Sequence, residues 1–378
     1  MRVLFNCLSS VSGGGVAYLR NISKLLVGEF LKSGRHELIF LAHEDQAGLL
    51  QGVDPARIIL ITGSRSDGLR RVCWERLHLP RYVQEQQVDV LFTPYQVAPL
   101  LRNVRNVLMI RNMEPFLFGG YPYGFRTRLR NEVLARVSSR CLRGADRVIA
   151  VSQFARDYLT TRLGIPDSRA RTVYHGSPPV RSVTTSSHMS ASLSQIGVTG
   201  EYILTCGSML PYRRYEDVIG GFNACVSLLP EEMQLVIAGL GADSRYAETI
   251  RQAIACSPAP ERIMTLGHVP WATMMDLYQN CAACVISTEI EACPNIALEA
   301  MSTGCVIISS NRPPLPEMFQ GCALEYRARD IEHLAEQMLR SIEDKPLRSN
   351  LKERAFQRSK SFSWQSSALK TYSALVDW

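Results

Sequence analysis

The feature that most constrains this chain is an alternation of short apolar runs with helical stretches, which stops once and then starts again. The first half contains the apolar runs "RVLFNCL", "ELIFLAH", "RIILIT", "DVLFTP", "VLMIRN", "RVIAVS" and "TVYHG". The second half repeats the pattern with "YILTCGS", "QLVIAGLG", "RIMTLGHV", "ACVIST" and "CVIISS". Strands alternating with helices predict a parallel sheet covered on both faces. We therefore predict an α/β chain of two doubly wound parallel-sheet domains that face a cleft.

A stretch poor in large apolar residues separates the two series. Residues 183–199, "VTTSSHMSASLSQIGVT", are dense in Ser and Thr, which is typical of a linker. We predict an N-terminal domain over 1–182, this linker, and a C-terminal domain over 200–358. The final segment, 359–378, is expected to form a helix that crosses back and packs on the N-terminal domain.

The length of 378 residues favours more than one hydrophobic core. No apolar run approaches the 18 or so residues of a membrane-spanning helix. The β-like run follows Met1 directly, so no signal peptide is expected, and the predicted location is the cytoplasm.

The net charge of +7 is unevenly distributed. Residues 1–185 carry +12 and the remainder carries −5. Much of the excess lies in one stretch where arginines alternate with apolar residues at helical spacing: Arg126, Arg128, Arg130, Arg136, Arg140, Arg143 and Arg147. Such a basic amphipathic helix attracts anionic lipid headgroups, phosphate-bearing acceptors or nucleic acid, although a merely solvated helix face has the same composition.

The eleven cysteines show no framework spacing. Cys281 and Cys284 in "NCAACVIS" have the spacing of half a zinc or redox site. No second pair of cysteines and no histidine cluster follows at the spacing of metal ligands. We therefore interpret these cysteines as buried structural thiols and predict no metal site.

Two loops of the C-terminal half carry the chemistry. In "STEIEACPNIALEAMSTG", a loop with Glu289 and Glu291 precedes a helix that starts near Pro294-Asn295 and carries Glu299. A helix N-terminus suits a phosphate, and a carboxylate on that helix suits a ribose diol. The same residues also fit an ordinary helix start.

The second loop, in "CGSMLPYRRYEDVI", places Arg213 and Arg214 between a strand and a helix at the same sheet edge. An arginine in such a loop binds diphosphate oxygens, although two exposed arginines are the plainer alternative. In the N-terminal half, Gly13, Gly14 and Gly15 allow close approach of the backbone to a ligand. They form neither G-x-G-x-x-G nor a P-loop, which counts against dehydrogenases and nucleoside triphosphatases.

These segments together resemble the large retaining GT-B glycosyltransferase family known as family 4, or glycosyl transferases group 1. The resemblance rests on Glu291-x7-Glu299, "GSMLPYRR", "LVIAGLG", "LGHVP", "ADRVIAVSQFA" and the glycine-rich loop. It implies a GT-B fold of two Rossmann-like domains, with the nucleotide-sugar donor bound by the C-terminal one and the acceptor by the other.

By this resemblance, Glu291 contacts the transferred sugar and Glu299 the ribose. Arg213 stands where the family usually has a diphosphate-binding lysine, and Ser208 where many members have a second arginine, a role left open for Arg214. Backbone N–H groups at the start of the helix would bind the distal phosphate, and Gly14 would let the first loop close over the donor. The helix-start residues are Asn295, Ile296 and Ala297.

One departure concerns the reacting sugar. Many relatives carry a His-Asp pair after the strand that matches "VLMI", whereas this chain has Arg111 and Asn112. Asn112 is therefore either a ligand of a sugar hydroxyl or a strand-end residue that caps a turn.

The implied reaction is hexosyl transfer from a nucleoside-diphosphate sugar with retention, without a cofactor or metal. The basic half favours a lipid-linked or lipopolysaccharide-type glycan acceptor in bacterial surface polysaccharide assembly, at the inner face of the cell membrane. Two alternatives are a nucleotide-sugar 2-epimerase of GT-B fold and a non-enzymatic nucleic-acid-binding protein. The paired-glutamate block counts against the first, and the lack of basic strands interleaved with aromatic residues counts against a nucleic-acid partner.

Overall fold

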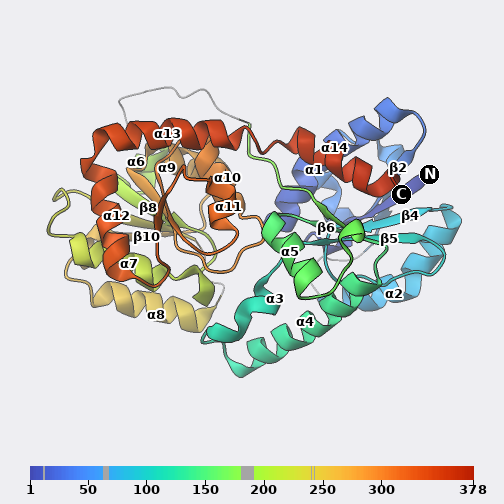
Figure 1. Ribbon diagram of the computed structural model, residues 1–378, viewed down its shortest axis with the longest axis horizontal. Coiled ribbons are helices and arrows are strands. Elements are labelled where there is room, and N and C mark those ends of the chain that lie inside the picture. Colours follow the sequence, from blue (N-terminus) through green and yellow to red (C-terminus); the bar gives the residue numbers. More distant parts are fainter. Residues whose placement is uncertain (12, 63–67, 180–190, 240, 242) are drawn as a thin grey trace. The chain divides into compact units, whose positions relative to one another are not determined.

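The computed structural model describes residues 1–11, 13–62, 68–179, 191–239, 241 and 243–378. The chain divides into two compact units. Unit 1 comprises Met1–Phe116, Phe125–Gly176 and Phe362–Trp378, and unit 2 comprises Leu117–Gly124 and Ser177–Ser361. Figure 1 shows the helices and strands of each unit, coloured from blue at the N-terminus to red at the C-terminus.

Unit 1 contains, within its described residues, a seven-stranded parallel sheet in the order β3-β2-β1-β4-β5-β6-β7. The apolar character of its central strands follows from burial on both faces, as parallel sheets require. All four residues of β4 are buried, for example. The strands are β1 (Arg2–Asn6), β2 (Glu37–His43), β3 (Ile58–Ile61), β4 (Val90–Thr93), β5 (Arg105–Ile110), β6 (Arg147–Ala150) and β7 (Ala170–Thr172).

Helices cover this sheet, and α14 from the C-terminal end of the chain packs on α1 (Figure 1). Ser152 caps α5 and Ser363 caps α14, each through its side-chain oxygen. The helices that lie wholly in unit 1 are α1 (Gly13–Ser33), α2 (Gly68–Glu85), α4 (Phe125–Gly144), α5 (Gln153–Thr161) and α14 (Trp364–Val376), and α3 (Glu114–Leu117) begins there. Short 3-10 turns are η1 (Cys7–Ser9), η2 (Glu44–Leu49), η3 (Pro55–Arg57) and η5 (Asp167–Arg169).

Unit 2 contains, over the part that the structure describes, a six-stranded parallel sheet in the order β10-β9-β8-β11-β12-β13. Strand β8, the first of this unit along the chain, pairs with both β9 and β11. The direction of the strand order therefore reverses between β8 and β11. The strands are β8 (Tyr202–Cys206), β9 (Gln234–Ala238), β10 (Ile263–Gly267), β11 (Ala283–Ile286), β12 (Ile307–Ser310) and β13 (Leu324–Tyr326).

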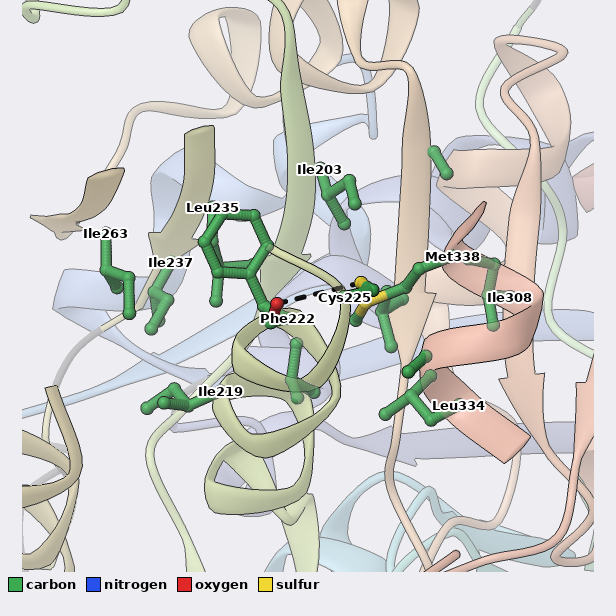
Figure 2. Packing of buried hydrophobic residues seen from close by; sticks show 14 of the residues in the cluster. Ile203, Ile219, Phe222, Cys225, Leu235, Ile237, Ile263, Ile308, Leu334 and Met338 are labelled. Carbon is green, nitrogen blue, oxygen red and sulfur yellow. Dashed lines mark hydrogen bonds between the residues drawn. The ribbon is translucent and has the colours of Figure 1, made fainter. Parts of the chain in front are cut away.

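The core of unit 2 lies where α7 and α12 pack on one face of this sheet. Figure 2 shows Phe222 and Cys225 of α7 between the strand residues Ile203 and Leu235 and the α12 residue Met338. The helices are α6 (Ala191–Gln195), α7 (Tyr215–Cys225), α8 (Ser244–Ala255), α9 (Trp271–Asn280), α10 (Asn295–Ser302), α11 (Leu315–Phe319), α12 (Ile331–Glu343) and α13 (Lys345–Ser359). The 3-10 turns are η4 (Phe118–Gly120), η6 (Pro211–Arg213) and η7 (Pro260–Arg262).

The two Rossmann-like parallel sheets confirm the predicted fold class. The predicted linker, 183–199, lies partly outside the described residues, and its described end carries α6. The structure differs from the expected division at Leu117–Gly124, which groups with unit 2 although both flanks belong to unit 1. The hydroxyl of Tyr121 donates to Glu289 Oε2 at 3.0 Å, which joins this segment to unit 2.

Candidate functional site

The two loops singled out in the sequence follow adjacent strands of unit 2. The "GSMLPYRR" loop follows β8, and the loop with the paired glutamates follows β11, its parallel neighbour. The sheet order reverses between these strands, which makes their carboxyl ends the topological switch point. In open α/β sheets, ligands bind in the crevice at such a point.

Hydrogen bonds tie the two loops together. Ser287 Oγ donates to the carbonyl of Arg213 at 2.6 Å, and the amide of Glu289 donates to the carbonyl of Tyr212 at 2.9 Å. A small pocket opens between the loops, and its lining includes Arg213, Ser287 and Ile296. The two loops therefore lie at the same sheet edge, as predicted, and contact each other there.

Arg213 and Glu291 form an ion pair at this pocket, and both side chains are mostly buried. Burial opposes the charged guanidinium, but the adjacent carboxylate outweighs this effect and holds the pKa of Arg213 above its ordinary value. Burial raises the pKa of Glu291, and Arg213 offsets this rise only in part. Without a ligand, the negative charge of Glu291 thus balances the positive charge of Arg213.

Arg214 and Ser208 have different surroundings. Arg214 lies in the left-handed region with φ of 54° and pairs with two carboxylates of the first turn of α7. Its Nη2 lies 2.6 Å from Asp217 Oδ1 and its Nη1 lies 2.6 Å from Glu216 Oε1. Arg214 thus anchors the start of α7, whereas Ser208 is exposed.

Glu299 lies on α10 in a largely buried position. Its Oε2 accepts a hydrogen bond from the Tyr278 hydroxyl at 3.3 Å, and that hydroxyl lies 3.0 Å from Cys206 Sγ at the end of β8. Burial raises the pKa of Glu299 to about 7, and the bond from Tyr278 partly counteracts it. Because this pKa lies near neutral pH, a ligand that donates hydrogen bonds to the carboxylate readily shifts Glu299 to its ionised form.

The start of α10 matches the prediction for its position in the chain. Pro294 is the N-cap, and Asn295, Ile296 and Ala297 form the first turn. The Ala297 amide donates to the Pro294 carbonyl at 3.1 Å. Because Ile296 also lines the pocket, the positive end of the α10 dipole lies at the same site as Arg213.

A second cluster surrounds Glu289, whose side chain is only 2 % exposed. Arg329 Nη2 lies 2.8 Å from Glu289 Oε2, and Arg312 Nε lies 3.4 Å from Oε1. Burial acts to raise the pKa of Glu289, but hydrogen bonds from Arg329 and Tyr121 outweigh burial and lower it. Glu289 is therefore held by two arginines and a tyrosine, whereas Glu291 pairs with Arg213 at the pocket.

The two candidates from the N-terminal half, Gly14 and Asn112, lie in unit 1. Gly14 is exposed in the first turn of α1. Asn112 Oδ1 accepts from the Glu114 amide at 3.0 Å, and its backbone exchanges two hydrogen bonds with the Gln96 side chain. Asn112 thus closes the turn that leads into the short helix α3, which is one of the two roles considered for it.

Cys281 and Cys284 are buried, and the Cys281 thiol donates to the Tyr278 carbonyl at 3.3 Å. Among the described residues, no group of three or more His, Cys, Asp or Glu side chains has the arrangement of a metal site. Within the same residues, no helix is both long enough and apolar enough to cross a lipid bilayer.

Two family models match successive parts of the chain. Residues 12–181 match Glycosyltransferase Family 4, and residues 194–358 match Glycosyl transferases group 1. The chain belongs to glycosyltransferase family 4. Its two parallel sheets are those of the GT-B fold, as the solved structures of similar chains confirm.

Three proteins illustrate what this chain is similar to. The O-antigen chain mannosyltransferase B of Escherichia coli is 27% identical over 175 residues, which is 46% of this chain and 45% of the relative. Alr3699/HepE of Anabaena, solved with UDP, has a TM-score of 0.73 at 18% identity, with 100% of both chains covered. WaaG, a glycosyltransferase involved in lipopolysaccharide biosynthesis, has a TM-score of 0.71 at 15% identity, with 99% of both chains covered. The chain spans less than half the length of the curated relatives it matches.

The sequence alone did not identify Tyr278, Arg329 or Tyr121 as neighbours of the site. Tyr278 comes from α9, and Arg329 follows β13, so no motif places them near the family's glutamates. The positive φ of 70° at Arg329 is one local sign of constraint, and only the structure reveals it.

Proposed function

We propose that this protein is a retaining glycosyltransferase that moves a hexosyl group from a nucleoside-diphosphate sugar to an acceptor hydroxyl. The observation that carries the proposal is the Arg213–Glu291 ion pair beside the start of α10, at the switch point of unit 2. It supplies a cation for a diphosphate and, in contact with that cation, a carboxylate for sugar hydroxyls.

Binding of the donor exchanges partners at this pair. The diphosphate replaces Glu291 as the counterion of Arg213, and backbone N–H groups at the start of α10 contact the distal phosphate. Glu291 then accepts hydrogen bonds from hydroxyls of the transferred sugar. The cost of opening the ion pair is offset because the incoming diphosphate carries more charge than the carboxylate it replaces.

The nucleoside is held by Glu299. The two ribose hydroxyls donate to its carboxylate, which stabilises the ionised form and lowers its pKa from about 7. Tyr278 fixes the orientation of that carboxylate through the 3.3 Å hydrogen bond.

In the reaction, the bond from the anomeric carbon to the diphosphate oxygen breaks and the acceptor oxygen attacks from the same face. The acceptor proton passes to the departing diphosphate. Arg213 and the N-terminus of α10 stabilise the charge that develops on this leaving group, a task for preorganised electrostatics. We propose that no divalent cation is required, so the transfer rate in EDTA is expected to equal the rate without it.

The acceptor that we propose is a lipid-linked or lipopolysaccharide-type glycan of bacterial surface polysaccharide. Two of the similar proteins support this class by their descriptions, one as an O-antigen chain mannosyltransferase and one as involved in lipopolysaccharide biosynthesis. Acceptors of this kind place the enzyme at the inner face of the cell membrane.

The outer face of α4 supports this location. Phe125, Leu129, Val133 and Val137 are exposed at a spacing of four residues, and Phe125 is 79 % exposed. The buried residues Asn131, Ser138 and Leu142 lie on the opposite face of α4. The exposed arginines on the apolar face are Arg126, Arg130, Arg136, Arg140 and Arg143. Apolar residues flanked by arginines that extend toward phosphates are typical of a helix lying in an anionic membrane interface.

The donor experiment incubates the protein with UDP- and GDP-hexoses and a lipid-linked glycan acceptor, and measures nucleotide release and the anomeric configuration of the product. We expect one nucleotide to be used, with retention. Arg213→Met and Glu291→Gln remove activity, whereas the exposed pair Arg251 and Glu248 supplies matched controls that keep it. Inversion, or activity that survives both substitutions, contradicts the proposal.

The membrane experiment measures co-sedimentation with vesicles of phosphatidylglycerol or of phosphatidylcholine alone, at low salt. We expect binding to the anionic vesicles only, and its loss in Phe125→Asp/Leu129→Asp. Leu228→Asp, at an exposed leucine of unit 2, is the control and keeps binding. Equal binding of both variants assigns the membrane contact to another surface.

A further inference from the structure

The segment Leu117–Gly124, which we call the strap, groups with unit 2 although the residues on both sides of it belong to unit 1. It contains the 3-10 turn η4 and ends immediately before α4. Tyr121, which follows η4, is only 7 % exposed. Connecting segments usually run over the surface with their side chains in water, so a buried tyrosine in the strap indicates a specific contact.

Tyr121 contacts the loop that carries the paired glutamates. Its hydroxyl donates to Glu289 Oε2 at 3.0 Å, and Glu289 lies two residues before Glu291. Arg329 donates to the same oxygen through Nη2 at 2.8 Å, and its guanidinium carbon lies 5.8 Å from the centre of the Tyr121 ring. The hydroxyl and the guanidinium together fix the Glu289 side chain, and with it this part of the loop.

Tyr121 also contacts the loop after β8. Its ring meets the Tyr212 ring edge-on, with the centroids 6.3 Å apart and an interplanar angle of 79°. The centre of the Tyr212 ring lies in turn 5.6 Å from the guanidinium carbon of Arg213. The backbone joins these contacts, since the Glu289 amide donates to the Tyr212 carbonyl at 2.9 Å. Tyr121 therefore touches both loops at the point where they are hydrogen-bonded to each other.

Both contacts of Tyr121 depend on direction as well as distance. A hydrogen bond to an ionised carboxylate is about twice as strong as one between neutral groups. Burial acts to raise the pKa of Glu289, but the hydrogen bonds from Arg329 and Tyr121 outweigh it and keep the carboxyl ionised. Edge-to-face packing of two rings is favourable only over a limited range of angles and separations. A shift of Tyr121 would therefore shift both loops.

We propose that Tyr121 is a positioning residue, which holds the two loops in the arrangement that aligns Arg213 with the diphosphate and Glu291 with the transferred sugar. This inference rests on the proposed glycosyl transfer and adds a role in it for a segment outside both loops. Tyr121 acts through Glu289 and Tyr212 and does not touch the substrate. Because turnover is far more sensitive than binding to small misplacements, loss of the hydroxyl should lower kcat more than nucleotide affinity.

The first test compares Tyr121→Phe with the matched control Tyr326→Phe. Tyr326 is a buried tyrosine of unit 2 whose hydroxyl has no hydrogen-bond partner among the described residues. In the transfer assay above, we expect kcat to fall about tenfold in Tyr121→Phe, while the calorimetric Kd of the nucleoside diphosphate stays within about twofold. Tyr326→Phe should keep both values. Equal kcat in the two variants, or a loss of affinity as large as the loss of kcat, overturns the proposal.

A double-mutant cycle tests the path through the carboxylate. Tyr121→Phe, Glu289→Met and the double variant are compared by kcat, and thermal unfolding of each protein separates loss of folded protein from loss of turnover. Because the hydroxyl acts through Glu289, Tyr121→Phe should have no further effect on kcat once Glu289 is replaced. Losses that simply multiply in the double variant contradict this path.

The ring contact is tested by Tyr121→Leu, which removes the packing on Tyr212 that Tyr121→Phe keeps. We expect a lower kcat in Tyr121→Leu than in Tyr121→Phe, and kcat values that are equal contradict a role of the ring. A wild type that transfers no sugar counts against the proposed function. Wild-type turnover in Tyr121→Phe, by contrast, overturns the positioning role alone.

Discussion

Two arginines occupy comparable positions in the two units, yet their surroundings differ. Arg213 and Arg111 each lie at the switch point of a parallel sheet and beside the start of a helix. Arg213 is paired with Glu291, whereas Arg111 has no paired carboxylate among the described residues. The same residue type thus serves a compensated site in one unit and an uncompensated site in the other.

The difference determines what a ligand must do. In unit 2, an anion competes with an existing carboxylate, so affinity depends on the excess charge and geometry of the ligand. In unit 1, no ion pair to a carboxylate is present at Arg111 among the described residues, so an anion there would not have to displace one. Substitutions should therefore have opposite effects on stability in the two units.

The largest expected effect concerns catalysis in the compensated site. Arg213→Met is expected to lower kcat/KM about 100- to 1,000-fold, the usual consequence of removing one group that stabilises a leaving oxyanion. Steady-state kinetics with the identified donor measure this change. Arg251→Met, the exposed arginine of α8, should stay within about twofold, and a similar loss in both variants contradicts the assignment.

The next effect concerns stability. Arg213→Met leaves Glu291 buried without a counterion, and the free energy of unfolding is expected to fall by about 3 kcal/mol, as for a broken buried pair. Arg111→Met is expected to leave it unchanged or to raise it. Urea denaturation of both variants, with the double substitution Arg213→Met/Glu291→Gln as a cycle, measures the difference. An equal loss of unfolding free energy in Arg213→Met and Arg111→Met would contradict the difference between the two sites.

The third prediction is a pH dependence that arises from Glu299. Because burial raises its pKa to about 7, the folded protein binds a proton that the unfolded chain releases. The stabilising contribution is complete below the ordinary carboxyl pKa and is lost as the pH rises to about 7. Glu299→Gln should flatten the stability profile over this interval. An unchanged profile indicates that Glu299 is already ionised.

Nucleotide binding should follow the opposite trend, since the ribose diol requires the ionised carboxylate. Affinity is expected to increase as the pH rises through 7 in the wild type and to be nearly constant in Glu299→Gln. Calorimetric titrations at pH 6 and pH 8 measure this change. A decrease in affinity with rising pH contradicts the role of Glu299.

The smallest expected effect is that of Tyr278→Phe. Loss of its hydrogen bond to Glu299 costs about 1 kcal/mol of nucleotide affinity and shifts the pH dependence upward, since the bond lowers the pKa of the carboxyl. Tyr202→Phe is a suitable control, because its hydroxyl bonds to the carbonyl of Leu277 and not to Glu299. Identical pH profiles for the two variants contradict a positioning role.

Much of the fold was accessible from the sequence because buried parallel strands are continuous apolar runs. The predicted strand "ELIFLAH" coincides with β2, and β9 lies within the predicted run "QLVIAGLG". By contrast, the last strand of unit 1 ends at Thr172, which is the first residue of the predicted run "TVYHG". Periodicity identifies an element well but its ends poorly, since the last turn depends on tertiary contacts.

The sequence predicted the candidate site only for residues that belong to local motifs, such as the loops after β8 and β11. Arg213 and Glu291 were predicted to lie at the same sheet edge because each follows a strand of one parallel sheet, and the structure shows that the two strands are neighbours. Arg214 has the same charge as Arg213, but the carboxylates of α7 engage it, which spacing alone does not reveal. The segment Leu117–Gly124 and the partner of Glu299 depend on contacts between residues far apart in sequence, so no local pattern predicts them.

The most direct test of the proposed donor site is calorimetric titration of UDP, GDP and ADP into the wild type, Arg213→Met and Glu299→Ala. The account predicts that one nucleotide binds the wild type and that both substitutions weaken it at least tenfold, with Arg251→Met unchanged. Binding that is undiminished in both variants would contradict the placement of the donor at the switch point of unit 2.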